Sequence, residues 1–343
     1  MPAMRHIAAV LALLLAAPAA GQDLASVWRG KTLTILAGMP PGGGYDLYAR
    51  LLGRHIGKHI PGNPQVVVQN MIGASSLAMA AHVANVAPRD GTIIGASIST
   101  QPLAPVLDDP ALLRFDATKF NYIGSGNEDA FLCIVGKDSP VQTFQEAFTK
   151  EVIMGGSSET GTTGYMPVLL ANVLGVKLKT VFGYPGTRDL ILAIQRREVQ
   201  GQCAQSWSSM NSQYADLLKS GAVKLFLQES LTGHPEMDKL GVPKAGDFAK
   251  TDEQRAILEI VYSQSVSGRP YFVGPGVAPE RIEALRKAFM DAWKDPELLA
   301  EAEKLNAEIG PVDGARLQTV LNKIYASPEE VKLKAREAIK VKR

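Results

Sequence analysis

The chain has 343 residues, a formal net charge of +2 and 20% charged residues. This near-neutral balance lacks the basic surface that binding to nucleic acid requires, so we expect no nucleic-acid partner. The length favours two domains, each large enough to bury its own core. With 32 glycines, the chain is expected to be rich in loops between its helices and strands.

The first 21 residues have the pattern of a secretory signal peptide. Arg5 precedes an apolar run over 7–17, and small residues at Ala19 and Gly21 fit a signal-peptidase site. The apolar run is too short to span a bilayer stably, and no cysteine near the cleavage site could carry a lipid. We therefore expect export to the periplasm, with cleavage near residues 19–21.

Short apolar runs alternate with helical patterns through two successive parts of the chain. In the first part we expect strands at 33–37, 66–69 and 93–96, with helices at 46–58 and up to Val86. In the second part we expect strands at 131–135, 152–154 and 180–182, with helices at 141–150, up to Leu174, and at 188–197. This alternation predicts βαβ units and mostly parallel sheets. The charged segment from Pro279 to about Ser327 predicts helices that act as scaffold.

A glycine-rich loop, Met39–Asp46, joins the first predicted strand to the first helix. The start of a helix presents unpaired backbone N–H groups and the positive end of the helix dipole. Gly42, Gly43 and Gly44 would let a ligand approach the backbone without obstruction by a Cβ atom. The loop therefore suits a carboxylate or a phosphate. We expect Asp46 to cap the helix and hold the loop without touching the ligand.

Two further small-residue loops follow strands in the second part, at Gly155–Gly164 and Gly183–Thr187. Ligands of open α/β sheets bind at the carboxyl ends of the strands. Two such edges that face each other would form a cleft between domains.

The sequence favours neither a metal site nor a catalytic centre. It contains no Cys-x-x-Cys or His-Glu-x-x-His motif, and His55 with His59 is interpreted as a solvated helix face. Nucleophile-elbow and P-loop motifs are absent too, and we expect no cofactor. Cys133 and Cys203 could form a disulfide in an oxidising compartment, or remain two buried thiols.

An ordered set of motifs resembles the Bug family, the periplasmic substrate-binding components of tripartite tricarboxylate transporters. The matching segments are Pro41–Asp46 with Ala49 and Arg50, Asn70–Ser76, Pro88–Thr92, Gly161–Thr162, Tyr184–Gly186, Pro279–Leu285 and Asp295–Glu297. The resemblance covers almost the whole mature chain. It implies an α/β, two-lobe periplasmic binding protein fold with an interdomain ligand cleft. Lobe 1 is expected to comprise 22–125 and 232–343, and lobe 2 to comprise 126–231.

The resemblance also implies a set of ligand-binding residues, most of them Gly, Ser or Thr. Such residues offer the N–H and O–H donors that a carboxylate needs. The predicted set is Gly43, Gly44, Tyr45, Ala74, Ser75, Ser97, Thr100, Ser157, Ser158, Gly161, Thr162, Thr163, Tyr184, Gly186, Arg188 and Asp189. Arg188 could bind a distal carboxylate or pair with a neighbouring acid. Trp207 could line the pocket or lie in the core.

The chain departs from the family pattern at several positions. Gly38-Met39 replaces the usual Pro-Phe before the first loop, and Ser75-Ser76 replaces a Gly pair. The segment Val242–Arg269 also fits the family poorly. These departures concern the identity of the ligand more than the fold.

The resulting hypothesis is a monomeric, non-enzymatic solute-binding protein. It captures a small organic acid by hinge closure and delivers it to the integral-membrane permease subunits of a tripartite tricarboxylate transporter. Two alternatives remain, a periplasmic sensor for a membrane kinase and an enzyme that acts on a small organic acid. An enzyme would require a base within hydrogen-bond reach of a nucleophile in the cleft.

Overall fold

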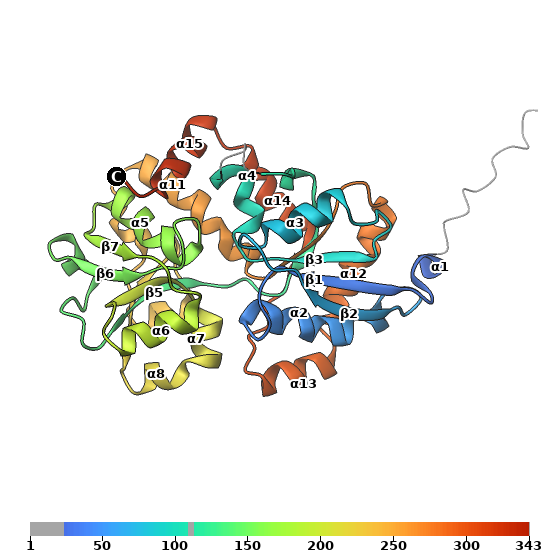
Figure 1. The fold of residues 1–343 in the computed structure, drawn as a ribbon, viewed down its shortest axis with the longest axis horizontal. Coiled ribbons are helices and arrows are strands. Elements are labelled where there is room, and N and C mark those ends of the chain that lie inside the picture. The colour runs from blue at the N-terminus through green and yellow to red at the C-terminus, as the bar shows by residue number, and fades with distance from the viewer. Residues whose placement is uncertain (1–23, 109–112, 343) are drawn as a thin grey trace, which may run out of the picture.

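A computed structural model of the protein describes residues 24–108 and 113–342. These residues form two α/β lobes side by side, each built around one sheet (Figure 1). Among them, no helix is both long and apolar enough to cross a membrane. The predicted signal peptide, 1–21, lies outside the described residues.

The first lobe contains a mixed six-stranded sheet in the order β11-β4-β10-β3-β1-β2. Its strands are β1 (Thr32–Ala37), β2 (Gln65–Asn70), β3 (Ile93–Ala96), β4 (Asn121–Ser125), β10 (Pro270–Val273) and β11 (Val312–Asp313). The predicted parallel pairing is confirmed for β1 with β2 and with β3. The expectation of a mostly parallel sheet is wrong here, because β4 and β11 pair antiparallel and β10, a strand that the sequence did not predict, is antiparallel to both neighbours. The chain returns from the second lobe beside the end of β3, so β10 has to run back along it.

The second lobe contains a five-stranded sheet in the order β7-β6-β8-β5-β9. Its strands are β5 (Phe131–Gly136), β6 (Val152–Gly155), β7 (Leu178–Val181), β8 (Gly201–Ser206) and β9 (Val223–Gln228). β6 is parallel to β7 and β8, whereas β5 is antiparallel to β8 and β9. A disulfide between Cys133 of β5 and Cys203 of β8 joins two neighbouring strands. This settles the pairing that the sequence left open.

Helices flank both sheets. The first lobe has α1 (Leu24–Trp28), α2 (Gly44–His55), η1 (Ile56–His59), α3 (Leu77–Asn85), η2 (Gln101–Leu103), α4 (Ala104–Leu107), η3 (Ala117–Lys119), α12 (Pro279–Ala292), α13 (Pro296–Lys304) and α14 (Gly314–Tyr325). Around the second sheet lie η4 (Phe144–Phe148), α5 (Thr162–Leu174), α6 (Thr187–Gln195), α7 (Trp207–Gln213), α8 (Ala215–Lys219), α9 (Pro235–Lys239), α10 (Ala245–Phe248) and α11 (Asp252–Tyr262). The predicted helix 141–150 is wrong. Only the short 3-10 helix η4 forms there, because β6 already begins at Val152.

The segment 232–262 packs on the second sheet. Lys244 forms a β-bridge with Gln228, and Phe248 contacts the rings of Phe144 and Phe148. Helix α11 then packs against α5. Because these contacts join the segment to the second lobe, we propose a boundary near residue 262 in place of the predicted 231. The chain returns to the first lobe through η5 (Ser263–Ser267).

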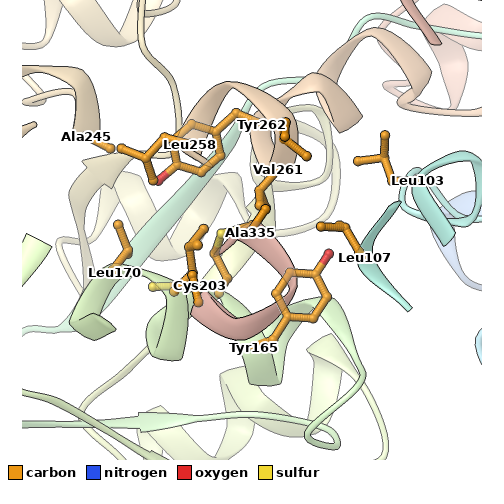
Figure 2. Packing of buried hydrophobic residues seen from close by; sticks show 14 of the residues in the cluster. Leu103, Leu107, Tyr165, Leu170, Cys203, Ala245, Leu258, Val261, Tyr262 and Ala335 are labelled. Atoms are coloured by element: carbon orange, nitrogen blue, oxygen red, sulfur yellow. The ribbon is translucent and has the colours of Figure 1, made fainter. Parts of the chain in front are cut away.

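The C-terminal helix α15 (Glu329–Ala338) packs against both lobes, contacting α11 and α5 of the second lobe and α4 of the first. Ala335 of α15 lies among Leu107 of α4, Leu170 of α5 and Leu258 of α11 (Figure 2). This shared apolar cluster means that the end of the chain is part of the contact between the lobes.

Candidate functional site

A cavity of about 410 Å³ lies between the lobes, beneath the end of α15. Its size falls within the range of about 300–1,000 Å³ that is typical of small-molecule sites. The lining comes from α3, η2 and α4 in the first lobe, from the loop before α5 and from α5 in the second, and from the C-terminal segment. The lining residues are Ala74, Ser75, Leu77, Ile98, Thr100, Gln101, Ala104, Leu107, Asp108, Leu113, Glu159, Thr160, Tyr165, Arg336, Ile339, Lys340 and Val341.

The loop before α3 reaches the cavity in an unusual backbone conformation. Ala74, Ser75 and Ser76 have φ values of 45°, 51° and 71°. L-residues adopt this left-handed region at a cost of roughly 1–3 kcal/mol each, and such strain tends to collect at functional sites. Ala74 and Ser75 line the cavity. Ser76 is buried, and its Oγ donates to the Gly38 carbonyl at 3.3 Å.

The segment after β3 presents hydroxyl and amide groups to the same space. Thr100 and Gln101 both line the cavity. Ser97, whose role as a ligand residue stays a prediction, orients Gln101, since its Oγ donates to Gln101 Oε1 at 3.2 Å. The Gln101 side chain is buried, and its Nε2 has no hydrogen-bond partner among the described residues.

The predicted Ser/Thr loop of the second lobe is held together by its own hydroxyls. Thr163 Oγ1 accepts from the Ser157 N–H at 3.1 Å, and Ser158 Oγ accepts from the Gly161 N–H at 3.0 Å. Thr162 reaches across to the first lobe, where its Oγ1 lies 3.5 Å from Thr100 Oγ1. These bonds fix the backbone of the loop, whose tip reaches the cavity wall at Glu159 and Thr160.

Tyr165, on the first turns of α5, contributes a second buried polar atom. Its hydroxyl points toward Leu107 across the boundary between the lobes (Figure 2) and interacts with the hydroxyls of Thr162 and Thr100. Burial raises the pKa of Tyr165 above its usual range, so the hydroxyl keeps its proton at neutral pH. Tyr165 and Gln101 therefore contribute buried polar side chains beside one cavity, one from each lobe. An ionised carboxylate has oxygens that only accept hydrogen bonds.

The first glycine loop lies at a different point between the lobes. Gly44 lines a separate, small cavity of about 20 Å³ with Arg269 and Ser209. A Cβ atom on Gly44 would lie 3.4 Å from Arg269 Nη2, so little space remains for a ligand. The Tyr45 hydroxyl donates to Ser99 Oγ at 3.2 Å and is thus engaged within the protein. Gly43, Gly44 and Tyr45 are not among the described residues that line the larger cavity.

Asp46 holds this loop in place, as predicted, although it lies inside α2 and Gly43 is the N-cap. Its carboxylate accepts from the Gly42 N–H at 2.9 Å, from Arg50 Nε at 2.9 Å and from Asn70 Nδ2 at 2.7 Å. Burial alone would raise the pKa of Asp46, but the hydrogen bonds from Arg50, Asn70 and Gly42 outweigh it and lower the pKa. The loop is therefore tied to both α2 and β2.

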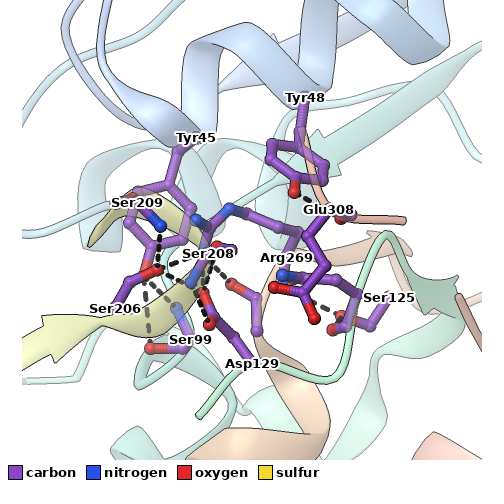
Figure 3. A network of polar contacts seen from close by, with 12 residues as sticks. Tyr45, Tyr48, Ser99, Ser125, Asp129, Ser206, Ser208, Ser209, Arg269 and Glu308 are labelled. Carbon is purple, nitrogen blue, oxygen red and sulfur yellow. Dashed lines mark hydrogen bonds and ion pairs between the residues drawn. The ribbon is translucent and has the colours of Figure 1, made fainter. Parts of the chain in front are cut away.

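A buried network around Arg269 joins the lobes beside this loop (Figure 3). The guanidinium carbon lies 4.5 Å from the ring centroid of Tyr45 and 4.9 Å from that of Tyr48. Arg269 Nη1 lies 3.3 Å from Asp129 Oδ2. The same carboxylate accepts from Ser208 Oγ of the second lobe at 2.9 Å. The network thus occupies the region in which the sequence predicted an anion to bind.

The remaining predicted ligand residues of the second lobe are not among the described residues that line the cavity. They are Tyr184, Gly186, Arg188 and Asp189, and their role in binding stays a prediction. Arg188 is exposed. Trp207 is a core residue, buried to 4% exposure, and its Nε1 donates to Glu236 at 2.8 Å.

Among the described residues, two groups have donor types that could hold a metal ion. In the first, the cysteines are joined in a disulfide and cannot act as thiolate ligands. In the second, His55 of α2 lies near Asp295, the N-cap of α13, and Glu297 of α13, and Lys58 already pairs with both carboxylates at 2.6 and 2.5 Å. This second group is an ion-pair network between two helices, so the interpretation of the histidines as a solvated face is corrected.

Sequence reasoning missed Gln101, Tyr165 and Arg336 as candidate site residues. Gln101 and Tyr165 follow predicted loops by only a few residues, so the loops gave some indication of them. Arg336 lies on the last helix, far from any loop of the cleft along the chain, and no local pattern indicates its position.

No family model and no curated protein matches the chain. Comparison with solved structures shows that the fold is that of two-lobe periplasmic solute-binding proteins of the TctC and Bug type. The chain is similar to the periplasmic binding protein BugD, with 20% identity, a TM-score of 0.66, and coverage of 90% of this chain and 98% of BugD. It is also similar to MatC of Rhodopseudomonas palustris, solved with bound malate, with 18% identity, a TM-score of 0.64, and coverage of 91% and 99%. A third similar structure is R. palustris Rpa4515 with adipate, with 18% identity, a TM-score of 0.66, and coverage of 90% and 98%.

Proposed function

We propose that the protein is a periplasmic solute-binding protein that holds a small organic carboxylate in the cavity between its lobes. In this proposal it delivers the acid to the permease subunits of a tripartite tricarboxylate-type transporter and does not convert it. Structural neighbours with bound malate and adipate support the ligand class. The pattern of the first 21 residues supports export.

The observation that carries this proposal is a cavity whose polar lining comes from both lobes. Thr100 and Gln101 come from the first lobe, and Thr160 and Tyr165 from the second. A carboxylate held there could accept hydrogen bonds from such hydroxyl and amide groups. Hydroxyls of Ser75, Thr100 and Thr160 lie in the same wall and can complete its hydrogen bonding.

Because donors come from both lobes, an acid could contact all of them only when the lobes are together. Thr100 and Thr162 mark this contact, with their hydroxyl oxygens 3.5 Å apart. Ligand binding would therefore favour the closed arrangement by the difference in contacts between the open and closed states. A permease could then distinguish loaded from empty protein by shape.

The test is a thermal-shift screen of the purified mature protein with small mono-, di- and tricarboxylates, aromatic acids and amino acids. An acid present at 100 times its Kd adds about 2.7 kcal/mol of stability. Gln101→Leu should abolish the shift, while Gln195→Leu, the same change at an exposed site on α6, should leave it intact. The mixture should be checked for conversion of the acid. No shift with any acid, or turnover of the acid, would refute the proposal.

A further inference from the structure

The C-terminal segment crosses from the first lobe to the second. Helix α14 belongs to the first lobe, where the hydroxyl of Tyr325 at its end donates to the Pro102 carbonyl at 2.7 Å. Pro328 follows closely and disfavours helical geometry at the residue before it, so α14 stops and α15 begins at Glu329. Figure 1 shows α15 next to α11 of the second lobe. The turn at 326–328 therefore directs the last helix onto the second lobe.

Apolar packing and hydrogen bonds hold α15 on the second lobe. Ala335 is fully buried near Leu170 of α5 (Figure 2), and α15 also packs against α11. Asn172 Nδ2 of α5 donates to the carbonyls of Ala338 at 2.9 Å and Lys340 at 3.0 Å. The last carbonyls of a helix lack partners within the helix, so this side chain caps the end of α15. The second lobe thus holds the helix both by its buried face and by its end.

The contact of α15 with the first lobe is narrower. The helix packs there against α4, which has 4 residues, whereas α5 has 13 and α11 has 11. Arg336 Nε donates to the Val106 carbonyl of α4 at 3.2 Å. Lys332 Nζ donates to the Tyr325 carbonyl at 3.0 Å, next to the turn at 326–328. Because the stabilisation from packing grows with the apolar area buried, release from α4 costs less than release from α5 and α11.

The end of α15 also covers one side of the cavity. Ile339, Lys340 and Val341 line it, together with Leu77 and Ile98 of the first lobe. Since the second lobe caps this end of the helix, these residues move with the second lobe if α15 leaves α4. Separation of α15 from α4 would therefore open this wall of the cavity.

We propose that α15 is a strap that moves with the second lobe and releases α4 of the first lobe when the cavity opens. The turn at 326–328 is the hinge of the strap, because it links α14 to α15 covalently. A ligand enters after the contact between α15 and α4 has broken and is enclosed when the contact forms again. This inference rests on the proposed function for the presence of a ligand, whereas the motion of the strap belongs to the empty protein as well.

The competing explanation is that α15 moves with the first lobe. The chain runs directly from α14 into α15, and the bond from Lys332 to the Tyr325 carbonyl supports this attachment. In that case, separation of the lobes would pull α15 away from α5 and would break both hydrogen bonds from Asn172. The two explanations differ in which distance changes when the lobes separate, that from α15 to the first lobe or that from α15 to the second.

The experiment measures distances between pairs of spin labels in the empty mature protein by double electron–electron resonance. Labels are attached to cysteines introduced at exposed positions, with Leu333→Cys on α15, Lys219→Cys on the second lobe and Lys294→Cys on the first. The native cysteines are joined in the disulfide and do not take the label. We expect two distances between the lobes, two between α15 and the first lobe, and one between α15 and the second lobe.

Three variants test the contacts of α15 directly. Arg336→Met keeps the apolar stem and removes the hydrogen bond to Val106, so it should raise the open fraction about two- to tenfold, with a single distance still between α15 and the second lobe. Arg196→Met, the same change at an exposed site at the end of α6, should leave the fraction unchanged. Asn172→Ala should instead broaden the distance between α15 and the second lobe.

Two outcomes overturn the inference. Two distances between α15 and the second lobe, with one between α15 and the first, would assign the helix to the first lobe. A single distance for every pair, in the wild type and in Arg336→Met, would show that α15 does not release α4. Malate or adipate, the acids bound in two neighbouring structures, should leave only the closed distances. If the wild type binds neither these acids nor any in the wider screen, the proposed function fails, and the distances in the empty protein still decide whether α15 is a strap.

Discussion

Glu229 should make the stability of the protein fall as the pH rises. Its side chain, 4% exposed at the end of β9, accepts from the Ala204 N–H at 2.5 Å through Oε1. Oε2 has no partner among the described residues, and the disulfide lies beside the carboxyl, with Cys133 Sγ 3.5 Å from Oε1. Burial raises the pKa of Glu229 to about 8, against 4.5 for an ordinary glutamate. Among the described residues, no cation offsets the cost of burying the Glu229 carboxylate.

The sign of the effect follows from proton binding. Between these two pKa values the folded protein holds a proton on Glu229 that the unfolded chain has lost, so unfolding becomes easier as the pH increases. The contribution of the neutral carboxyl is complete below about pH 4.5 and is lost progressively up to about pH 8. Each pH unit in this window is worth about 1.4 kcal/mol, so between pH 5 and pH 7.5 the loss is about 3 kcal/mol.

Glu229→Gln keeps the shape and the acceptor for Ala204 but cannot ionise. We expect urea unfolding to give similar stability for the variant and the wild type at pH 5. At pH 7.5 the variant should be more stable by about 3 kcal/mol. All other groups titrate in both proteins, so their contributions cancel when the unfolding free energy of one protein is subtracted from that of the other. Parallel curves of stability against pH would refute the reasoning, because they would show that Glu229 titrates as it does in the unfolded chain.

Four further changes test other parts of the structure. Replacing Cys133 and Cys203 by Ala opens a loop with a sequence separation of 70 and should cost about 4 kcal/mol in urea unfolding; a loss below 1 kcal/mol would contradict the pairing. Tyr165→Phe should lower the unfolding free energy of the unliganded protein by no more than about 1.5 kcal/mol, yet weaken acid binding about tenfold by titration. Arg269→Met leaves the buried carboxylate of Asp129 without its cation and should lower the free energy of unfolding by about 3–5 kcal/mol. Gly43→Val should keep the melting temperature, because a Cβ atom there would meet nothing closer than 3.9 Å. If this variant loses acid binding in calorimetry, the first glycine loop contacts the ligand.

Local patterns were sufficient for the strands and loops that depend on neighbouring residues. The loop containing Gly42 and the alternation of β1, α2 and β2 follow directly from glycine spacing and apolar periodicity. β10 could not be oriented in this way. Its direction is set by where the chain re-enters the first sheet, about 170 residues after β3, and that is a property of the tertiary fold.

Two departures from the family pattern turn out to be coupled in space. A Cβ on Gly38 would lie 2.5 Å from Ser76 Oγ, so a side chain at 38 and the observed placement of Ser76 exclude each other. Ser76 in turn has a left-handed backbone, which explains why a glycine would fit this position easily. Each departure looks isolated along the sequence. Only the packing shows that Gly38 makes room for the Ser76 hydroxyl.

The larger cavity lies away from the first glycine loop for one physical reason. The first glycine loop was expected to meet a ligand, but Arg269, brought in by the returning chain, fills that space and supplies its positive charge to Asp129. The anion at this junction is therefore a carboxylate of the protein itself. The larger cavity lies farther along the contact between the lobes, where small and polar side chains of Ser75 and Thr100 face the α5 loop.

The Arg269 network and the cavity contribute differently to the contact between the lobes. The Arg269 network is buried and fully internal, so it favours contact between the lobes whether or not an acid is bound. The cavity leaves open space between the lobes, so its contribution to the same contact is incomplete until an acid is present. Ligand-dependent closure therefore depends on the balance between them, and strengthening the Arg269 network would weaken the response to ligand by populating the closed state in its absence.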